Sequence, residues 1–459
     1  MTASVRPLSA ADLTPVYHEQ VREVLTRPSL SYWQDAWIRL KANRRALVSL
    51  WIVIGLLVFT VFGPFVWRVD PAAQDLDQIS QPPGVDRTAW IVTPLPIWNG
   101  ETQGEGSGTG LRAFGDPDTQ AIRLRWDPAP EATGGYRIYR NIFPIGPERA
   151  YGLPLVMSRN EIWYEDRLDL RPRTYYYSVL PLNELGEHSG EAQIVELEAR
   201  RVITVDEARK RGLLALDHIP VNGETVKLKL HPLGTDYLGR DMLARLMYGA
   251  RVSLFIGIVA PLLYVLFGIL YGATAGFIGG VLDAVMMRFA DFVVALPFLL
   301  FMILFKFIFQ VSAGESGIMP MLVALVILSW PATSRLVRGQ ILQIREEGYI
   351  GASKLLGAKT RYLILRHMIP NTMGVILVTL TFAVPSAIFT EAFLSFIGMG
   401  VAPPTPSWGS MCNEGIKTML TTPHELVFPA LLISITVLAF NLLGDGLRDA
   451  LDARMRSRE

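Results

Sequence analysis

The chain has 459 residues, half of them hydrophobic, and its mean hydropathy of +0.30 is too high for an ordinary soluble protein. Its 43 basic and 42 acidic residues nearly cancel, so no field would gather a nucleic acid and no polynucleotide partner is predicted. A single cysteine excludes an internal disulfide, and six scattered histidines predict no metal site. The apolar residues are therefore expected to be segregated into membrane-spanning segments.

Six apolar stretches are long enough to span a bilayer. The first, residues 46–67, covers roughly 33 Å as a helix, against a hydrocarbon core of about 30 Å. A long polar segment precedes it, which indicates a retained signal anchor rather than a cleaved signal peptide. The sequence thus predicts an all-α polytopic membrane bundle of six transmembrane helices. The five further helices, within residues 252–445, are expected at 252–277, 292–311, 318–336, 371–397 and 426–443.

Basic residues flank these spans unevenly. They precede the first span, follow the last and crowd the loop between the fourth and fifth, whereas residues 405–425 contain one Lys and no Arg. Because positively charged loops stay in the cytoplasm, the N-terminal segment 1–45 and the tail 446–459 are both predicted to be cytoplasmic. Trp33 and Trp37, at helical spacing beside basic residues, suit either a helix in the lipid headgroup region or one packed on other spans.

The long segment between the first two spans, residues 68–251, is therefore predicted to lie outside the cell membrane. After a Gly-rich linker, apolar residues such as Ile122 and Leu124 alternate with polar ones. This period of two is typical of antiparallel strands with one wet face. We expect an inserted all-β sandwich at about residues 118–200, and an external segment at 231–251 that leads into the second span.

The runs WDPAPEATGGYRIYR (126–140) and YEDRLDLRPRTYYYSVLPLNELGEHS (164–189) resemble a fibronectin type III domain. In that family a buried Trp faces an early aromatic residue of the next strand, and a Leu-x-Pro turn leads to a Tyr that bonds across the sandwich corner. The resemblance and the strand alternation together predict a sandwich core. Its aromatic members are Trp126, Tyr136, Tyr175 and Tyr177.

Motifs for catalysis are missing from the sequence. A P-loop requires Gly-x-x-x-x-Gly-Lys-Ser/Thr, and the nearest string, Gly357-Ala358-Lys359-Thr360, displaces the Lys and lacks the upstream Gly. The chain is therefore predicted not to be an enzyme. If it drives active transport, the energy must come from a partner protein.

A short helix is predicted in the basic loop between the fourth and fifth spans. Tyr349, Ala352, Ser353 and Leu356 recur at helical spacing and form a narrow face of small and apolar residues, which Gly357 ends. Such a helix is suited to docking in a groove of another protein. Periodicity alone also allows, and slightly favours, packing of the helix on its own bundle.

The loop 345–371 resembles the EAA loop of importer permeases of the ATP-binding-cassette class. Ala352 and Ser353 stand for its paired Ala residues, Gly357 for its Gly, and Gly351 takes the place of its Glu. The resemblance implies that the helix 346–358 contacts an ATPase subunit. The predicted ATPase-coupling residues are Glu346, Glu347, Tyr349, Gly351, Ala352, Ser353, Leu356, Gly357 and Ala358.

Four further strings resemble the dipeptide and oligopeptide permease subfamily: WQDAWIRLKANRRAL (33–47), HPLGTDYLGRDMLARLMYGARVSL (231–254), TEAFLSFIGMGVAPPTPSWGSM (390–411) and FPALLISITVLAFNLLGDGLRDALDAR (428–454). In such permeases Gln-Pro-Pro runs almost directly into the His-Pro-x-Gly-Thr-Asp string, which defines residues 84–230 as an insertion.

The resemblance implies a permease of the bacterial inner membrane that moves peptides or similar small solutes by alternating access. Its implied partners are a second homologous permease, two ATPase subunits that bind ATP and Mg, an extracytoplasmic solute-binding protein and membrane lipid. No cofactor is expected in this chain. The alternative is an adhesion or receptor protein that acts through its external sandwich, although a single span would suffice as its anchor.

The Gly-Thr-Asp and Gly-Arg-Asp strings allow two interpretations. Thr235 and Asp236 are predicted to cap a helix that starts directly after them, and Asp241 to pair with Arg245 four residues on. Alternatively, these residues and Arg240 close the external mouth or meet the binding protein.

Lys306 and Glu391 are ionisable residues near or within spans, which by default predicts a polar pathway. Lys306 lies near the outer end of its span and can also snorkel to the interface. Glu391 can instead bond within the bundle. The role of the sandwich stays open between a rigid spacer and a contact with the binding protein or the second permease.

Overall fold

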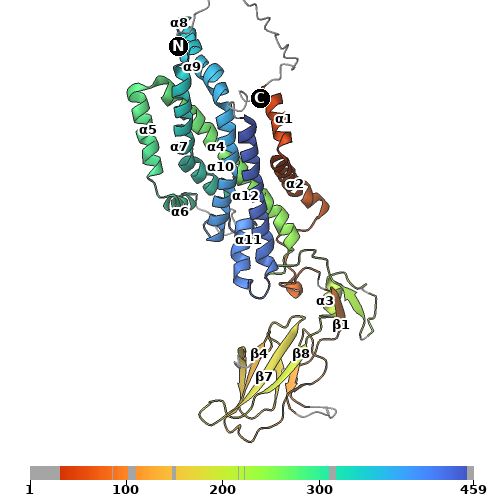
Figure 1. Ribbon diagram of the computed structural model, residues 1–459. Helices are drawn as coiled ribbons and strands as arrows, with labels where there is room; N and C mark the ends of the chain where they lie inside the picture. Colours follow the sequence, from red (N-terminus) through yellow and green to blue (C-terminus); the bar gives the residue numbers. More distant parts are fainter. Residues whose placement is uncertain are drawn as a thin grey trace, which may run out of the picture. The chain divides into compact units, whose positions relative to one another are not determined.

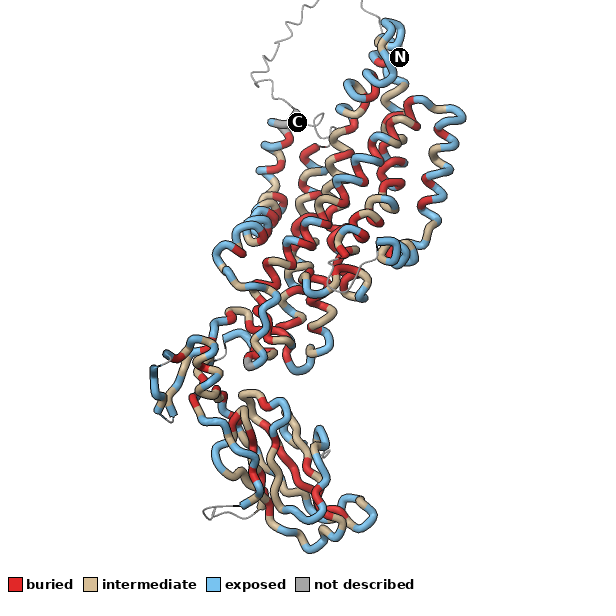
Figure 2. Tube along the Cα trace, turned by 180° about the vertical axis from the view of Figure 1, so that it is seen from behind, coloured by how far each residue is buried: buried red, intermediate tan, exposed pale blue. Residues whose placement is uncertain are grey.

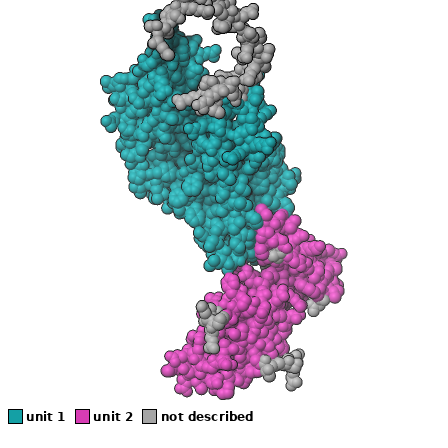
Figure 3. Space-filling view, viewed as in Figure 1, with its two compact units in different colours: residues 1–80, 235–459 teal, residues 81–234 magenta. Residues whose placement is uncertain are grey.

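A computed structural model of the chain describes residues 32–84, 86–101, 110–146, 151–215, 217–221, 223–309 and 317–451. It divides into two compact units, which Figure 3 distinguishes by colour. A helical unit contains the residues up to Ser80 and from Thr235 onward, and a β unit contains Gln81–Gly234. The predicted segments 1–31 and 452–459, the centre of the Gly-rich linker and residues 310–311 of the predicted third span lie outside the described residues.

The helical unit is an elongated bundle (Figure 1). Five of its helices are long and apolar enough to cross a membrane: α2 (Arg44–Val66), α4 (Met242–Ile278), α7 (Ile318–Arg345), the continuous helix Thr360–Phe396 and α12 (His424–Leu451). Its shorter helices are α1 (Tyr32–Ala42), α5 (Gly280–Val294), α6 (Phe298–Ile308), α8 (Gly348–Leu355) and α11 (Trp408–Gly415). The polytopic helical bundle predicted from hydropathy is thus confirmed.

The predicted third span is not one straight helix. Residues 292–311 fall across α5 and α6, which meet at an angle of 82° and give a sixth span only if the bent pair is counted as one. Pro297 at the break lacks a backbone N–H, and its ring disfavours the helical conformation at Leu296. Hydropathy records the apolar run but not this break.

The fifth predicted span begins earlier than expected. A four-residue helix, α9 (Thr360–Leu363), continues through a π-helical turn (Ile364–Met368) into α10 (Ile369–Phe396). Pro370 cannot donate the regular hydrogen bond to the preceding turn, and the wider π turn immediately before it accommodates that loss. The second half of the predicted basic loop is therefore helical.

The bundle is held together by a backbone contact between α4 and α7. Gly268, Gly272 and Gly276 recur every fourth residue of α4, facing α7. A Cβ at Gly268 would lie 2.9 Å from the Trp330 carbonyl oxygen, and one at Gly276 3.0 Å from that of Arg338. Small residues at this spacing let two membrane helices approach closely. Accordingly α4 and α7 bury the largest shares of their apolar windows, 56% and 50% (Figure 2).

We predict that Gly272→Ala destabilises the bundle, because a Cβ there would overlap the backbone of Ser334. Overpacking of this kind costs about 1–3 kcal/mol, and unfolding in mild detergent, followed by tryptophan fluorescence, would measure it. Gly55→Ala in α2 is the matched control, since nothing lies within 4 Å of its Cβ position. Equal stability of the two variants would contradict the role given to Gly272.

The β unit contains a sandwich of two antiparallel sheets. One sheet has the order β2 (Arg112–Ala113), β3 (Ile122–Arg125), β6 (Trp163–Asp166). The other has the order β5 (Leu153–Ser158), β4 (Gly135–Asn141), β7 (Thr174–Leu182), β8 (Gln193–Glu198). The inserted β domain predicted from strand alternation is confirmed.

The predicted aromatic core lies between these two sheets. Trp126, Tyr136, Tyr175 and Tyr177 are all buried, and the rings of Trp126 and Tyr136 meet edge to face at 5.6 Å. The Tyr175 hydroxyl accepts a 2.7 Å hydrogen bond from the Arg171 amide, across the corner before β7.

A third sheet, outside the sandwich, was not predicted. It joins β10 (Thr225–Lys227), β1 (Thr88–Val92) and β9 (Val202–Thr204), with the short helix α3 (Val205–Lys210) directly after β9. Both flanks of the sandwich contribute to it, since β1 precedes the sandwich and β9 follows it. The segments before and after the sandwich are therefore not linkers. They pair with each other and form a separate sheet.

Candidate functional site

The segment from Thr235 to Asp241 makes a tight turn before α4. Gly239 has a φ of +73°, and its backbone lies against Asp75, whose amide donates to the Gly239 carbonyl at 3.2 Å. Only glycine combines this φ with such a close approach. The turn places Asp241 at the N-cap of α4. The Asp241 carboxylate accepts hydrogen bonds from the Ala244 amide at 2.7 Å and from the Trp67 indole N–H at 3.1 Å.

This geometry corrects the predicted caps. Thr235 and Asp236 do not cap a helix, because the turn at Gly239 separates them from α4, and Asp241 takes the capping role. The Thr235 hydroxyl donates instead to the Gln78 carbonyl. Arg245 does not pair with Asp241; its partners are Asp236 and a residue far along the chain, Glu414.

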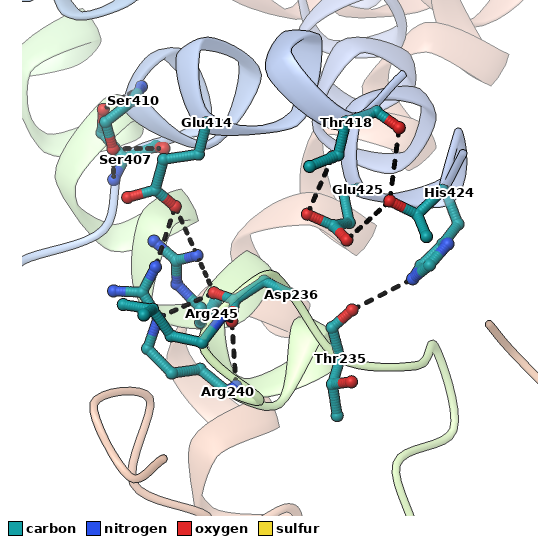
Figure 4. Close-up of polar contacts among 12 residues, drawn as sticks. Thr235, Asp236, Arg240, Arg245, Ser407, Ser410, Glu414, Thr418, His424 and Glu425 are labelled. Atoms are coloured by element: carbon teal, nitrogen blue, oxygen red, sulfur yellow. Dashed lines mark hydrogen bonds and ion pairs between the residues drawn. The ribbon is translucent and has the colours of Figure 1, made fainter. Parts of the chain in front are cut away.

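We call Asp236, Arg240, Arg245 and Glu414 the ion-pair network (Figure 4). Arg240 donates to Asp236 at 2.7 Å and to Glu414 at 2.9 Å, and Arg245 donates to Glu414 at 2.6 Å and also to Asp236. The four side chains are 2–11% exposed. Two cations and two anions cancel, so the network is buried without net charge.

The environment of Arg240 keeps its guanidinium charged. Burial alone would lower the pKa of Arg240, but the carboxylates of Asp236 and Glu414 outweigh that effect and raise the pKa above its usual value. Asp236 is likewise fixed by the backbone, since its Oδ1 accepts from the amides of Leu238 and Arg240, both at 2.9 Å. The network is consequently a fixed arrangement of charges.

Two residues at the start of α12 extend this polar cluster (Figure 4). The His424 imidazole lies 3.0 Å from the Thr235 carbonyl oxygen. The buried Glu425 carboxylate accepts from the hydroxyls of Thr418 at 3.1 Å and Thr422 at 2.8 Å, which fixes the turn between α11 and α12. Segment 235–245, α11 and the start of α12 thus form one connected end of the bundle.

The chain enters and leaves the β unit at adjacent points of the helical unit. The Ser80 amide donates to the Asp236 carbonyl at 2.8 Å, and the Thr235 hydroxyl bonds Gln78. We call this pairing of residues 75–80 with 235–240 the neck. Both ends of the insertion are thus held together within the helical unit.

The opposite end of α4 and α7 carries the predicted docking helix. α8 spans Gly348–Leu355, shorter than the predicted 346–358, because Glu346 and Glu347 form the turn after α7. Only Ile350 of α8 is buried. Leu355 and Leu356 are 91% and 89% exposed, and Tyr349 is 44% exposed. The helix therefore presents most of its surface away from its own bundle.

Gly357 ends this helix in the left-handed conformation, with a φ of +82°. Its amide donates to the Lys354 carbonyl at 2.9 Å and the Ala358 amide to the Ser353 carbonyl at 3.1 Å, which is a Schellman cap. Gly351 sits mid-helix with nothing within 4 Å of its Cβ position, so a side chain there would point into open space. Ala352 is exposed and Ser353 and Ala358 are half-buried.

The predicted pathway residues lie apart from the network. Lys306 is half-buried on α6 and donates to the Gly398 carbonyl at 3.4 Å. Glu391 is fully buried on α10, accepts from the Ser395 hydroxyl at 2.8 Å, and faces the hydroxyls of Ser253 and Ser407. Its Oε2 has no hydrogen-bond partner among the described residues. No contact between Lys306 and Glu391 is present in the described part of the chain.

Glu414, His424 and Glu425 were not predicted from the sequence. Glu414 lies 169 and 174 residues from the two arginines it binds, so no local spacing could reveal the pairing. Among the described residues, no group of His, Cys, Asp or Glu side chains could hold a metal ion.

Family profiles match both parts of the helical unit. The N-terminal transmembrane domain of oligopeptide transport permease C matches residues 31–83, and the inner membrane component of binding-protein-dependent transport systems matches residues 268–457. The oligopeptide transport system permease protein OppC of Bacillus subtilis is 46% identical over 236 residues, 51% of this chain and 76% of that protein. The chain belongs to the family of binding-protein-dependent transport permeases.

Further similar proteins include a second transport permease and a solved transporter structure. The dipeptide transport system permease protein DppC of Bacillus subtilis is 48% identical over 227 residues, 49% of this chain and 69% of that protein. A solved structure of the MetNI methionine transporter in an inward-facing conformation covers 46% of this chain and 98% of that one, at 18% identity and a TM-score of 0.37. This permease is thus an inner-membrane component of an ATP-binding-cassette transporter and not itself an enzyme.

The β unit lies between the two profile matches, which end at residue 83 and begin at residue 268. The 236 aligned residues are 76% of OppC, which puts its length near 310 residues, about 150 fewer than the 459 of this permease. The difference matches the size of the inserted unit, Gln81–Gly234. The permease carries an extra domain on a conserved transport framework.

We predict that Asp236→Asn destabilises the permease. The substitution keeps the oxygen that the backbone amides bind but removes one of two carboxylates that face Arg240 and Arg245. Breaking a buried ion pair in this way costs about 3–5 kcal/mol, which a thermal-unfolding assay in detergent would detect.

Asp291→Asn is the control for this variant. Asp291 pairs with Arg335 at 2.7 Å, but both side chains are nearly half exposed, so its loss should cost no more than about 1 kcal/mol. If both variants unfold at the same temperature, the ion-pair network does not hold this end of the bundle.

Proposed function

We propose that this permease is one half of the translocation pathway of a peptide importer. Two of the similar proteins are named as an oligopeptide and a dipeptide permease, and the chain covers 76% and 69% of their lengths. We infer that this chain also transports peptides. The other half of the pathway would be a second homologous permease, and two ATPase subunits that bind ATP and Mg would drive alternating access.

The observation that carries this proposal is the uncovered surface of α8. Ile350 anchors the helix in the core, while Tyr349 and Leu355 on this eight-residue helix and Leu356 directly after it are exposed. Two leucines about 90% exposed are unfavourable in water and indicate a partner that covers them. A helix that projects from the bundle with an apolar end fits a groove on an ATPase subunit.

We propose that the loop around α8 is an EAA-type coupling loop with a changed polar contact. Gly351 holds the position of the expected Glu, and it lies on the open side of α8. Glu346 is exposed and pairs with Arg345 at 3.1 Å, so it can offer its charge only from the turn before the helix. The docking contact of this permease would therefore depend on shape and apolar area more than on that carboxylate.

The proposed orientation follows from this assignment. With α8 at the ATPase, the loop 345–371 and both termini are cytoplasmic, and the ion-pair network and the β unit are extracytoplasmic. A solute-binding protein would then meet the end of the bundle that contains Asp236 and Glu414. We propose that the ion-pair network keeps this external mouth rigid while the spans move, because packed, ion-paired segments shift as bodies.

Of the two pathway candidates, we propose Lys306 as the residue that lines the route. It is half-buried on the bent α5–α6 pair, and among the described residues its one hydrogen bond is the 3.4 Å contact with the Gly398 carbonyl, which leaves donors of its ammonium group for a solute carboxylate. Glu391 is enclosed by three serines on different segments, and we assign it to joining α10 to α4 and to the residues before α11.

We propose that the inserted sandwich is a fibronectin type III domain. The strand order of three plus four, the buried Trp126 against Tyr136 and the Tyr175 hydroxyl that bonds Arg171 all support this assignment. Its position in the first external loop suits contact with the binding protein or the second permease. A rigid spacer is the alternative, and the family profiles that flank it give no support to an adhesion protein as the main function.

Replacement of Gly357 by Val tests the coupling proposal. A β-branched residue at a φ of +82° strains the cap of α8 by roughly 1–2 kcal/mol, in a place where the chain itself offers open space. We expect a normal amount of folded permease in the membrane but loss of solute-stimulated ATP hydrolysis by the purified complex. Gly55→Val in α2 is the control. Unchanged stimulation in the Gly357 variant would contradict the proposal.

Removal of the sandwich tests its role. Residues 95–199 would be replaced by a linker of about six Gly and Ser residues, which keeps β1, β9 and the bond from Arg201 to Gln81. If the sandwich contacts the binding protein, docking of that protein should weaken at least tenfold while ATPase subunits still co-purify. Unchanged docking and uptake would assign the sandwich to a spacer role.

A further inference from the structure

An apolar groove with two cationic residues at one end runs between α2 and α12. It has a volume of about 380 Å³ and is lined by residues 44–52 of α2 and 435–442 of α12. Apart from Arg44 and Arg45, its one polar side chain is Ser49, whose hydroxyl already donates to the Arg45 carbonyl at 2.8 Å. The groove therefore offers hydrocarbon walls to a ligand and no free hydrogen-bonding group along them.

Arg44 and Arg45 begin α2 and mark the charged end of this groove. Both are exposed, and neither side chain forms an ion pair or a hydrogen bond with any described residue. Asp445 and Asp449 lie exposed in the last turns of α12, yet they make no ion pair with these arginines. Two unneutralised guanidinium groups at a membrane surface attract an anion and bind the oxygens of a phosphate well.

The groove lies where the described chain leaves α2 and α12 largely uncovered. Only 28% of the apolar window of α2 and 22% of that of α12 are buried within the chain, and Val48 and Leu438 of the groove are each 58% exposed. Directly before α2, the helix α1 exposes Trp37 and Ile38, and Lys41 lies 4.9 Å from the Trp37 ring. An exposed Trp beside basic residues is typical of a helix at the headgroup level.

We infer that this groove binds one anionic phospholipid. The phosphate would lie at Arg44 and Arg45, and an acyl chain would fill the space between Ile52 and Leu438. Charge complementarity favours this occupant, because a phospholipid joins a phosphate to a long hydrocarbon chain in one molecule, as the groove joins two arginines to an apolar wall. Basic pockets between membrane helices are known to hold such headgroups. The lipid would fasten α2 to α12 on their open side.

Native mass spectrometry of the full-length permease, with the subunits that co-purify with it, tests this inference. The probes are phosphatidylglycerol and phosphatidylcholine of equal chain length. We expect phosphatidylglycerol to be retained preferentially. Arg44→Gln together with Arg45→Gln should weaken its binding about thirtyfold, since each basic residue near an anionic headgroup is worth about five- to sixfold. Phosphatidylcholine binding should change little.

Leu438→Trp tests the apolar groove separately from the two arginines. The larger ring fills the groove from its exposed side while both arginines remain, so it should displace the lipid without harming the fold. Arg448→Gln is the matched control, because Arg448 is an exposed cation on α12 that does not line the groove. It should retain the lipid as the parent does. Undiminished phosphatidylglycerol binding in both groove variants would overturn the inference.

A second measurement decides whether protein rather than lipid covers the groove. Cys412 is the one native cysteine, so Leu438→Cys in a Cys412→Ser background gives a single reactive site in the groove. With a photoreactive phosphatidylglycerol, we expect labelling of peptides that contain residues 44–52 and 435–442. A cross-link from Cys at this position to the second permease, without lipid labelling, would assign the groove to the subunit interface and overturn the inference.

Discussion

The close approach of α4 and α7 is the constraint on which the rest of the helical unit depends. Where a carbonyl oxygen lies about 3 Å from a Cβ position, a glycine is required, and Gly268, Gly272 and Gly276 meet this requirement over two turns. In lipid, where hydrophobic burial between helices is weak, this backbone contact supplies the packing. The two helices it joins carry the ion-pair network at one end and α8 at the other. Both functional ends are therefore mounted on the most closely packed pair in the bundle.

The neck explains how a domain of about 150 residues can interrupt such a bundle. Residues 75–80 and 235–240 bond to one another within the helical unit, and Gly239 permits the approach of the Asp75 backbone. The turn that makes this approach also aims Asp236 at Arg240 and Arg245. The same few residues thus close the insertion point and neutralise the buried arginines.

Sequence patterns predicted what depends on the local environment and missed what depends on distant partners. Apolar runs marked the spans, and alternation marked strands such as Ile122–Arg125, because burial in lipid or under a second sheet acts on each segment separately. The helix cap was assigned to Thr235 and Asp236 since nothing in their spacing reveals that Gly239 turns the chain. Glu414 was missed because its arginines are more than 160 residues away. The break at Pro297 lies inside an apolar run, where hydropathy does not distinguish one straight helix from two helices that meet at an angle.

The proposed coupling through α8 can be followed along the bends and glycines of the bundle. α8 is attached to the closely packed pair at two points: Ile350 lies in the core, and Lys354 lies over the Phe277 ring of α4 at 4.9 Å. Just before α8, Arg345 at the end of α7 donates to the Gly276 carbonyl of α4 at 3.2 Å. A force on α8 would therefore reach α4 and α7 directly. The irregular elements, the 82° bend between α5 and α6 and the π turn before α10, lie beside this pair and not within it. Since packed pairs move as bodies and irregular turns absorb the change in angle, the displacement would be taken up at those two joints while the ion-pair network keeps the far end of α4 intact.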